Sequence, residues 1–125
     1  MDVRTIADRA PRVEHEGTTT VWWMYDAREA FDETTGGSLE FLIEQEIAAG
    51  AAPAASSRRA HQYYYVLAGH GLMTVAAETR EVAPGDLVSV PPDTLHAWRA
   101  VGDRANVHQS SGIASTRSGK ASPPT

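Results

Sequence analysis

The chain contains no cysteine, which excludes disulfides, thiolate metal ligands and a cysteine nucleophile. Its eleven basic residues are outnumbered by sixteen acidic ones, and they are scattered along the sequence. Proteins that bind nucleic acid or an anionic membrane through charge gather their basic residues on one face, so we expect neither partner. The sequence also lacks the roughly 18 to 20 apolar residues of a membrane span and the apolar core of a secretory signal. We therefore expect a cytoplasmic protein.

What is present is the composition of an ordinary globular protein, with 42% hydrophobic and 22% charged residues. A chain of 125 residues fits one domain with one modest core, so any site lies inside that domain or between copies of it. We expect a loosely held arm over residues 1–18, a folded domain over 19–113, and a disordered tail over 114–125, where Ser, Gly, Pro and Lys predominate.

A period of two marks residues 38–47 as a strand with one apolar and one polar face. The apolar face carries Leu39, Phe41, Ile43 and Ile47. The other face carries Glu40, Leu42, Glu44 and Glu46. We expect the glutamates to be solvated, although they would offer carboxylates to a cavity if their face were the inner one.

Further strand signals follow one another at short intervals, with turn residues between them. The strands are expected over 20–25, 61–68, 72–76, 80–82, 87–90, 94–101 and 104–109. Residues 69–71 are expected to form a hairpin turn, and 61–68, which hardly alternate, a strand covered on both faces. The one helical signal is the capping-box spacing of Asp26 and Glu29, which predicts a short turn over 27–33. This pattern indicates an all-β sandwich or barrel.

Two segments resemble the paired motifs of the cupin superfamily. The second motif is Pro84–Asp86, an apolar strand, two prolines, and then His96 followed by Trp98. The first is recognisable at its end, Tyr64–Gly71, and together the motifs cover about residues 56–98. The resemblance implies a cupin-type conical β-barrel, a double-stranded β-helix or jelly roll, that holds a small molecule.

In metal-dependent cupins the first motif supplies two histidines and a glutamate, and the second motif supplies one more histidine. The resemblance puts these positions at Ser56, Arg58, Gln62 and His96. Arginine stays protonated and has no lone pair to give, and serine and glutamine are poor substitutes for imidazole and carboxylate. A transition-metal site normally needs about three or four protein ligands. We therefore predict a degenerate first motif and expect no cofactor.

Without a metal, the same positions still carry chemistry. Histidine moves protons near neutral pH, and a guanidinium holds a carboxylate or stabilises developing negative charge. We predict proton transfer on a carbonyl-bearing or aromatic acid, by isomerisation, cyclisation or dehydration. The resemblance supplies the deoxysugar epimerases as a metal-free precedent, and single-domain cupins are also similar in scale to aromatic polyketide cyclases. The expected catalytic residues are His96, Arg58, Tyr64 and Gln62, and the expected substrate-binding residues are Trp98, Ser56 and Glu44.

Two alternatives stay open. One is an iron, manganese or zinc cupin, a dioxygenase or lyase, with His96, His61 and Gln62 or a glutamate as ligands. The other is a module that binds a small ligand without turnover. The remaining histidines, His15, His70 and His108, are expected at the surface or in structural roles.

We also expect a homodimer. The strand over Tyr63–Leu67 and the tryptophans Trp22 and Trp23 hold more apolar surface than one small barrel covers.

Overall fold

The computed structural model describes residues 1–26, 28–29, 39–52 and 55–112, of which 103–112 are described by their backbone alone. One short 3₁₀ helix, η1 (Ile6–Asp8), precedes the strands. The strands are β1 (Arg12–Glu14), β2 (Thr19–Tyr25), β3 (Leu39–Ala48), β4 (Gln62–Val75), β5 (Glu78–Val82), β6 (Leu87–Val90) and β7 (His96–Gly112). Within the described residues, no helix has both the length and the apolar character needed to cross a membrane.

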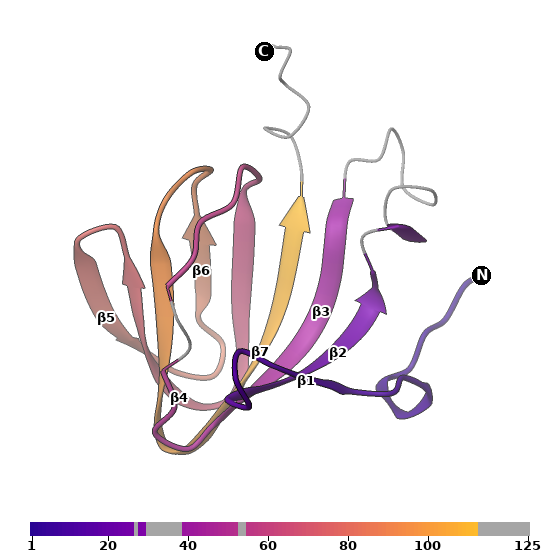
Figure 1. Ribbon diagram of the computed structural model, residues 1–125, viewed down its shortest axis with the longest axis horizontal. Helices are drawn as coiled ribbons and strands as arrows, with labels where there is room; N and C mark the ends of the chain where they lie inside the picture. The colour runs from indigo at the N-terminus through magenta and orange to yellow at the C-terminus, as the bar shows by residue number, and fades with distance from the viewer. Residues whose placement is uncertain (27, 30–38, 53–54, 113–125) are drawn as a thin grey trace.

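All strand pairs are antiparallel, and the described strands follow the order β1-β2-β3-β7-β4-β5, with β6 also paired to β4. Figure 1 shows this order across the molecule, from β5 at one side to the β1–β2 hairpin at the other. The all-β prediction is confirmed.

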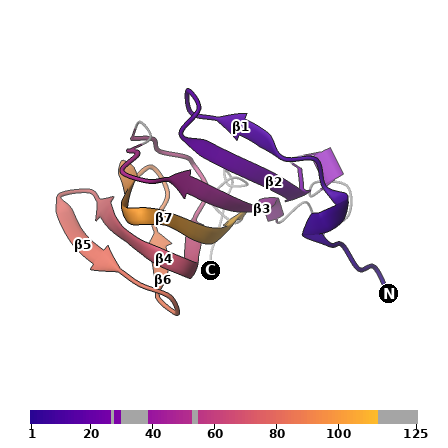
Figure 2. The ribbon, with the colours of Figure 1, turned by 90° about the horizontal axis from the view of Figure 1, so that it is seen from below.

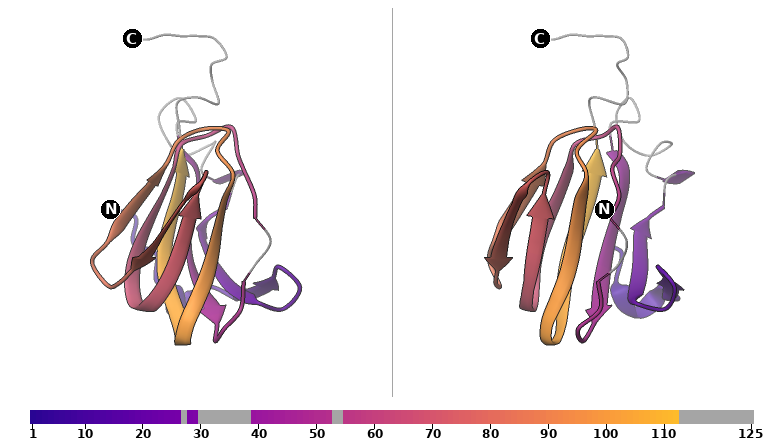
Figure 3. Two further views of the ribbon diagram at one scale, coloured as in Figure 1. Left: turned by 90° about the vertical axis from the view of Figure 1, so that its left-hand side faces the viewer. Right: turned by 60° about the vertical axis from the view of Figure 1, so that its left-hand side comes forward.

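Two long strands bend and so fold the sheet on itself. The first part of β4 pairs with β6 and the end of β7, whereas its second part pairs with β5 and the start of β7. The β4–β7 register shifts on both sides of Gly69, and β7 bulges at Gly102, whose φ of 77° suits glycine. Seen from below, the sheet curves from β5 round to the β1–β2 hairpin (Figure 2), and the side views show the same closure (Figure 3).

The predicted hairpin turn at residues 69–71 is therefore wrong, because these residues bend a continuous strand. The actual hairpin turn lies at Ala76 and Ala77, between β4 and β5. For the same reason the two strands expected over 94–101 and 104–109 are one strand, β7, with a bulge between them. Glycine permits a bulge as readily as a turn, so the residue type alone did not distinguish them.

The period of two in β3 is confirmed: Phe41, Ile43, Gln45 and Ile47 are buried, and the glutamates between them are partly exposed. β4 alternates in the same way, with Tyr64 and Val66 buried in the core and Tyr63, Tyr65 and Leu67 exposed. The prediction that this strand is covered on both faces is wrong for the single chain, because aromatic and aliphatic residues also occupy its outer face.

The first eighteen residues include a short strand and contact β2. β1 pairs with β2, and the Arg4 guanidinium donates to the Met24 carbonyl and to Glu29, both at 3.0 Å. The predicted capping box is formed: the Glu29 amide donates to Asp26 at 2.8 Å, and the Asp26 amide donates back at 3.2 Å. Ala27 and residues 30–33 of the predicted turn, and the predicted tail over 114–125, lie outside the described residues.

Candidate functional site

A cavity of about 280 Å³ lies between the two halves of the folded sheet. Its apolar wall consists of Val21, Trp23, Phe41, Ile43, Ile47, Ala97 and Trp98. Its polar lining consists of Glu14, His15, Thr19, Gln45, Ser56, Arg58, Gln62, Tyr64 and His96. Six residues predicted to bind or act on a substrate thus line one cavity: Ser56, Arg58, Gln62, Tyr64, His96 and Trp98.

A buried tyrosine–histidine pair is the chemical centre of the cavity. Tyr64 Oη lies 2.9 Å from His96 Nε2, and the two side chains are 4% and 3% exposed. His96 Nδ1 lies 3.0 Å from the Thr94 carbonyl oxygen, which only accepts hydrogen bonds. In the neutral form of the ring, Nδ1 is therefore the protonated nitrogen, and the Tyr64 hydroxyl donates to the lone pair on Nε2.

The fold brings this pair together from distant places in the sheet. Tyr64 lies in the part of β4 that pairs with the far end of β7 at Gln109, whereas His96 opens β7. The backbone of Ser56 fixes His96 from the other side, through hydrogen bonds of 3.0 and 2.9 Å. The bend in β4 therefore creates the contact between the phenol and the imidazole.

Burial sets the protonation state of the tyrosine. Desolvation raises the pKa of Tyr64 well above its usual range, and the positive charge of Arg58 only partly opposes this. Tyr64 is consequently a neutral phenol at physiological pH, and it can pass on a proton without remaining charged.

Trp98 and Gln62 complete the inner end of the cavity. The Trp98 indole meets the Tyr64 ring edge-on, with centroids 5.7 Å apart. A Cβ added at Gly71 would lie 2.7 Å from Trp98 Cζ3, so glycine is required where the indole rests on β4. Within the described residues, the buried Trp98 Nε1 has no hydrogen-bond partner. Gln62 is buried and lines the same cavity.

Arg58 lies at the mouth of the cavity, and its side chain is 44% exposed. Its Nε donates to Glu40 Oε1 at 3.0 Å, and its Nη2 lies 2.9 Å from the same oxygen. The guanidinium also lies over the Phe41 ring, 4.9 Å from the centroid. Arg58 is thus a residue of the rim, held by an ion pair and an aromatic ring.

Two predicted residues are not part of the cavity. Glu44 lies on the outer face of β3, because neighbours along a strand point to opposite faces and Ile43 and Gln45 take the inner one. His61 is on the outer side as well: its Nε2 lies 2.7 Å from Ser89 Oγ. The three ligands of the metal-dependent alternative, His96, His61 and Gln62, therefore do not meet at one point.

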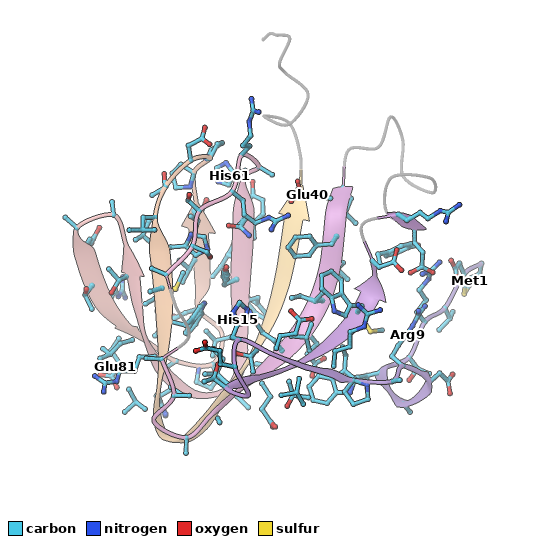
Figure 4. All side chains as sticks on the ribbon, viewed as in Figure 1. Met1, Arg9, His15, Glu40, His61 and Glu81 are labelled. Carbon is cyan, nitrogen blue, oxygen red and sulfur yellow. The ribbon has the colours of Figure 1, made fainter. Side chains whose placement is uncertain are left out.

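The contribution of the β1–β2 hairpin to the cavity lining was not predicted from the sequence. Glu14 Oε2 accepts a hydrogen bond of 3.0 Å from Trp23 Nε1, and both residues line the cavity. His15, expected in a solvated arm, is exposed but also lines the cavity, on the turn labelled in Figure 4. No local signal marks these two residues, because their placement depends on the pairing of β1 with β2. Phe41 and Ile43 could have been found from the alternation of β3.

The residues of the cavity do not fit a divalent transition metal. Both ring nitrogens of His96 are engaged, and the Nε2 lone pair that a metal would need accepts the Tyr64 hydroxyl. Arg58 adds a positive charge to the lining. In the described part of the chain, no three His, Asp or Glu side chains come together as a metal-binding group.

Comparison with known proteins agrees with this architecture. An uncharacterized protein of Methanocaldococcus jannaschii is 34% identical over 67 residues, which cover 49% of this chain and 54% of that protein. The matched region thus spans about half the length of that curated relative. The structure of a predicted oxalate decarboxylase of Thermotoga maritima has a TM-score of 0.79 at 11% identity, covering 90% of this chain and all of that one, 100%.

The structure of the polyketide cyclase RemF of Streptomyces resistomycificus has a TM-score of 0.73 at 18% identity, covering 91% of this chain and 80% of that chain. At these identities the structural likenesses show the fold alone. The family model described as the cupin domain matches residues 43–108, more than half of the sequence. This chain belongs to the cupin family and has its β-barrel fold.

Proposed function

We propose that this cupin is a small-molecule enzyme that moves a proton on a carbonyl-bearing or aromatic acid without a metal, in an isomerisation, cyclisation or dehydration. The observation that carries the proposal is the hydrogen bond of 2.9 Å between Tyr64 and His96, both buried and both lining the cavity. A buried, oriented imidazole with a phenol beside it is a proton-transfer device.

The pair supports a relay with a defined direction. An acidic O–H or activated C–H of the substrate gives its proton to Tyr64 Oη while Tyr64 gives its own proton to His96 Nε2. The substrate becomes an enolate or alkoxide, and the imidazole becomes an imidazolium whose Nδ1–H still donates to the Thr94 carbonyl. Return of the proton to a different substrate atom completes an isomerisation. Tyr64 stays neutral throughout, as its raised pKa requires.

The walls of the cavity favour a flat, largely apolar substrate. Trp23 and Phe41 meet edge-on, with centroids 5.5 Å apart, and Trp98 forms a further aromatic wall. Pockets for small ligands typically combine such walls with a few converging polar groups, and their volumes start at about 300 Å³. A polyketide cyclase among proteins of similar fold is consistent with an aromatic or carbonyl-rich substrate.

The proposal excludes a catalytic metal because of the donor set. Nε2 of His96 cannot accept the Tyr64 proton and bind a cation through the same lone pair. If a metal were needed, a chelator would abolish activity.

Hydrogen–deuterium exchange tests the proposal without knowledge of the natural substrate. Phenylpyruvate is an aromatic 2-oxo acid whose benzylic protons exchange through an enol, and proton NMR in deuterium oxide follows their loss. We expect the protein to accelerate this exchange and His96→Ala to lower the acceleration by about 10²- to 10⁴-fold. His61→Ala, the matched control on the outer face, should leave it unchanged, as should EDTA.

Exchange that is equally fast in His96→Ala would contradict the relay, and exchange that EDTA abolishes would contradict the metal-free mechanism. Binding of phenylpyruvate without any acceleration would indicate a binding module instead of an enzyme.

We further propose a homodimer formed through the outer face of β4 and β6. Tyr63, Tyr65, Leu67 and Leu87 are exposed there to 37%, 43%, 43% and 61%. β4 and β6 are neighbours in the sheet, so these side chains belong to one surface. A second copy would remove this apolar surface from water.

A further inference from the structure

The guanidinium of Arg58 has two edges that can each bind a carboxylate with two parallel hydrogen bonds. One edge consists of Nε and Nη2, and both of these atoms lie within 3.0 Å of Glu40 Oε1. The other edge consists of Nη1 and Nη2. Within the described residues, Nη1 has neither a hydrogen bond nor an ion pair. One end of the guanidinium therefore remains open at the mouth of the cavity.

Two contacts fix the orientation of that open edge. Glu40 holds one side of the guanidinium, and the Phe41 ring supports its face at 4.9 Å from the centroid. Glu40 and Phe41 are consecutive residues of β3, so one strand provides both contacts. Glu40 is labelled in Figure 4, close to where β3 begins. An arginine oriented in this way loses less side-chain freedom on binding than a freely rotating one.

The lining next to Arg58 is suited to the body of an aromatic ligand. Phe41, which supports the guanidinium, also forms the cavity wall together with Trp23. The carboxylate of Glu14 is already occupied by the Trp23 indole N–H at 3.0 Å. Arg58 is the arginine of the lining, whereas its neighbour Arg59 lies outside it.

From this geometry we propose that Arg58 is a carboxylate-binding subsite, so that the substrates are planar aromatic carboxylates bound with the carboxylate at the mouth. The ring lies against Phe41 and Trp23, and the opposite end of the molecule reaches the Tyr64–His96 pair. The inference rests on the proposed function only in placing the reacting end of the substrate at the Tyr64–His96 pair. Carboxylate binding itself requires no turnover.

Glu40 also affects how tightly such a ligand binds. Its negative charge orients Arg58, but it also repels a second carboxylate on the same guanidinium. Glutamine at this position keeps an oxygen that accepts from Nε and removes the charge. Glu40→Gln should therefore strengthen the binding of a carboxylate and leave a neutral ligand unaffected.

Calorimetric titration with 2-naphthoate and with its neutral amide, 2-naphthamide, tests the subsite. We expect the wild-type protein to bind the carboxylate about tenfold more tightly than the amide, the size of one charge-assisted hydrogen-bond pair. Arg58→Gln should abolish this preference, and Arg58→Lys, which keeps the charge but lacks the planar edge, should reduce it to about threefold. Glu40→Gln should tighten naphthoate binding about threefold.

Arg59→Gln is the matched control, because it removes the same charge one residue away and outside the cavity lining; the preference should persist. Equal binding of acid and amide by the wild type, or a preference that survives Arg58→Gln, would overturn the subsite. The preference should also persist in His96→Ala. Phenylpyruvate exchange that survives with unchanged KM in Arg58→Gln would leave the relay intact and reject the subsite, so the two failures are distinguishable.

Discussion

Two histidine–tyrosine pairs lie on opposite sides of the same sheet. In the outer pair the His61 and Tyr63 rings stack at 4.8 Å with an interplanar angle of 13°, and His61 Nε2 lies 2.7 Å from Ser89 Oγ. In the inner pair His96 and Tyr64 are buried, tilted by 48° and joined by a hydrogen bond of 2.9 Å. The residue types are the same, but the outer pair lies outside the cavity that the inner pair lines.

The difference follows from strand geometry and not from residue chemistry. Tyr63 and Tyr64 are neighbours on β4, and neighbours on a strand point to opposite faces. The inner phenol loses its hydration, which raises its pKa and directs its proton to the imidazole. Burial thus gives this pair the orientation and the restricted protonation that the proposed proton transfer requires.

The largest expected effect comes from exchanging one tyrosine of each pair for phenylalanine. Tyr64→Phe removes the hydroxyl between substrate and His96, so phenylpyruvate exchange should fall by about 10²-fold or more. Tyr63→Phe removes the same atom from the outer face and should leave the exchange rate within about twofold. Equal losses in the two variants, measured by NMR, would show that the inner pair has no special role.

A smaller effect is expected from Val66 and Leu67, two further neighbours on β4 that lie on opposite faces. Val66 is 1% exposed in the core, so Val66→Ala should lower the free energy of unfolding by about 1 to 3 kcal/mol, as measured in urea. Leu67 is 43% exposed on the outer face. Leu67→Glu should instead convert the proposed homodimer to a folded monomer in sedimentation equilibrium. A wild-type protein that sediments as a monomer would contradict the homodimer.

The sequence predicted the parts of this structure that depend on local pattern. The alternation in β3 identified its buried face, and the capping box at Asp26 is formed as the spacing indicated. The two faces of β4 could not be separated by polarity, because tyrosine and leucine occupy the outer face of the strand as well. The bend near Gly69 was misread because glycine permits both a turn and a bulge.

The candidate site likewise contains residues that the sequence predicted and residues that it could not predict. Resemblance to the cupin motifs, rather than periodicity, brought Ser56, Arg58, Gln62 and His96 together, and the structure places all four in the lining of one cavity. The exposed position of Arg58 and the inclusion of His15 depend on contacts between segments far apart in the sequence. Local sequence patterns carry no information about such contacts.

The smallest expected effect concerns stability at alkaline pH. Burial raises the pKa of Tyr64 in the folded state, so the folded protein retains a proton that the unfolded chain loses near pH 10. The stabilising contribution of the neutral phenol is therefore fully present below about pH 10 and decreases as the pH rises further. The thermal midpoint of the wild-type protein should fall more steeply than that of Tyr64→Phe between about pH 9 and 11. Groups that titrate in both proteins cancel in this comparison. Parallel pH profiles would show that the Tyr64 phenol is hydrated in the folded protein. The inner pair would then be no more isolated from water than the outer pair.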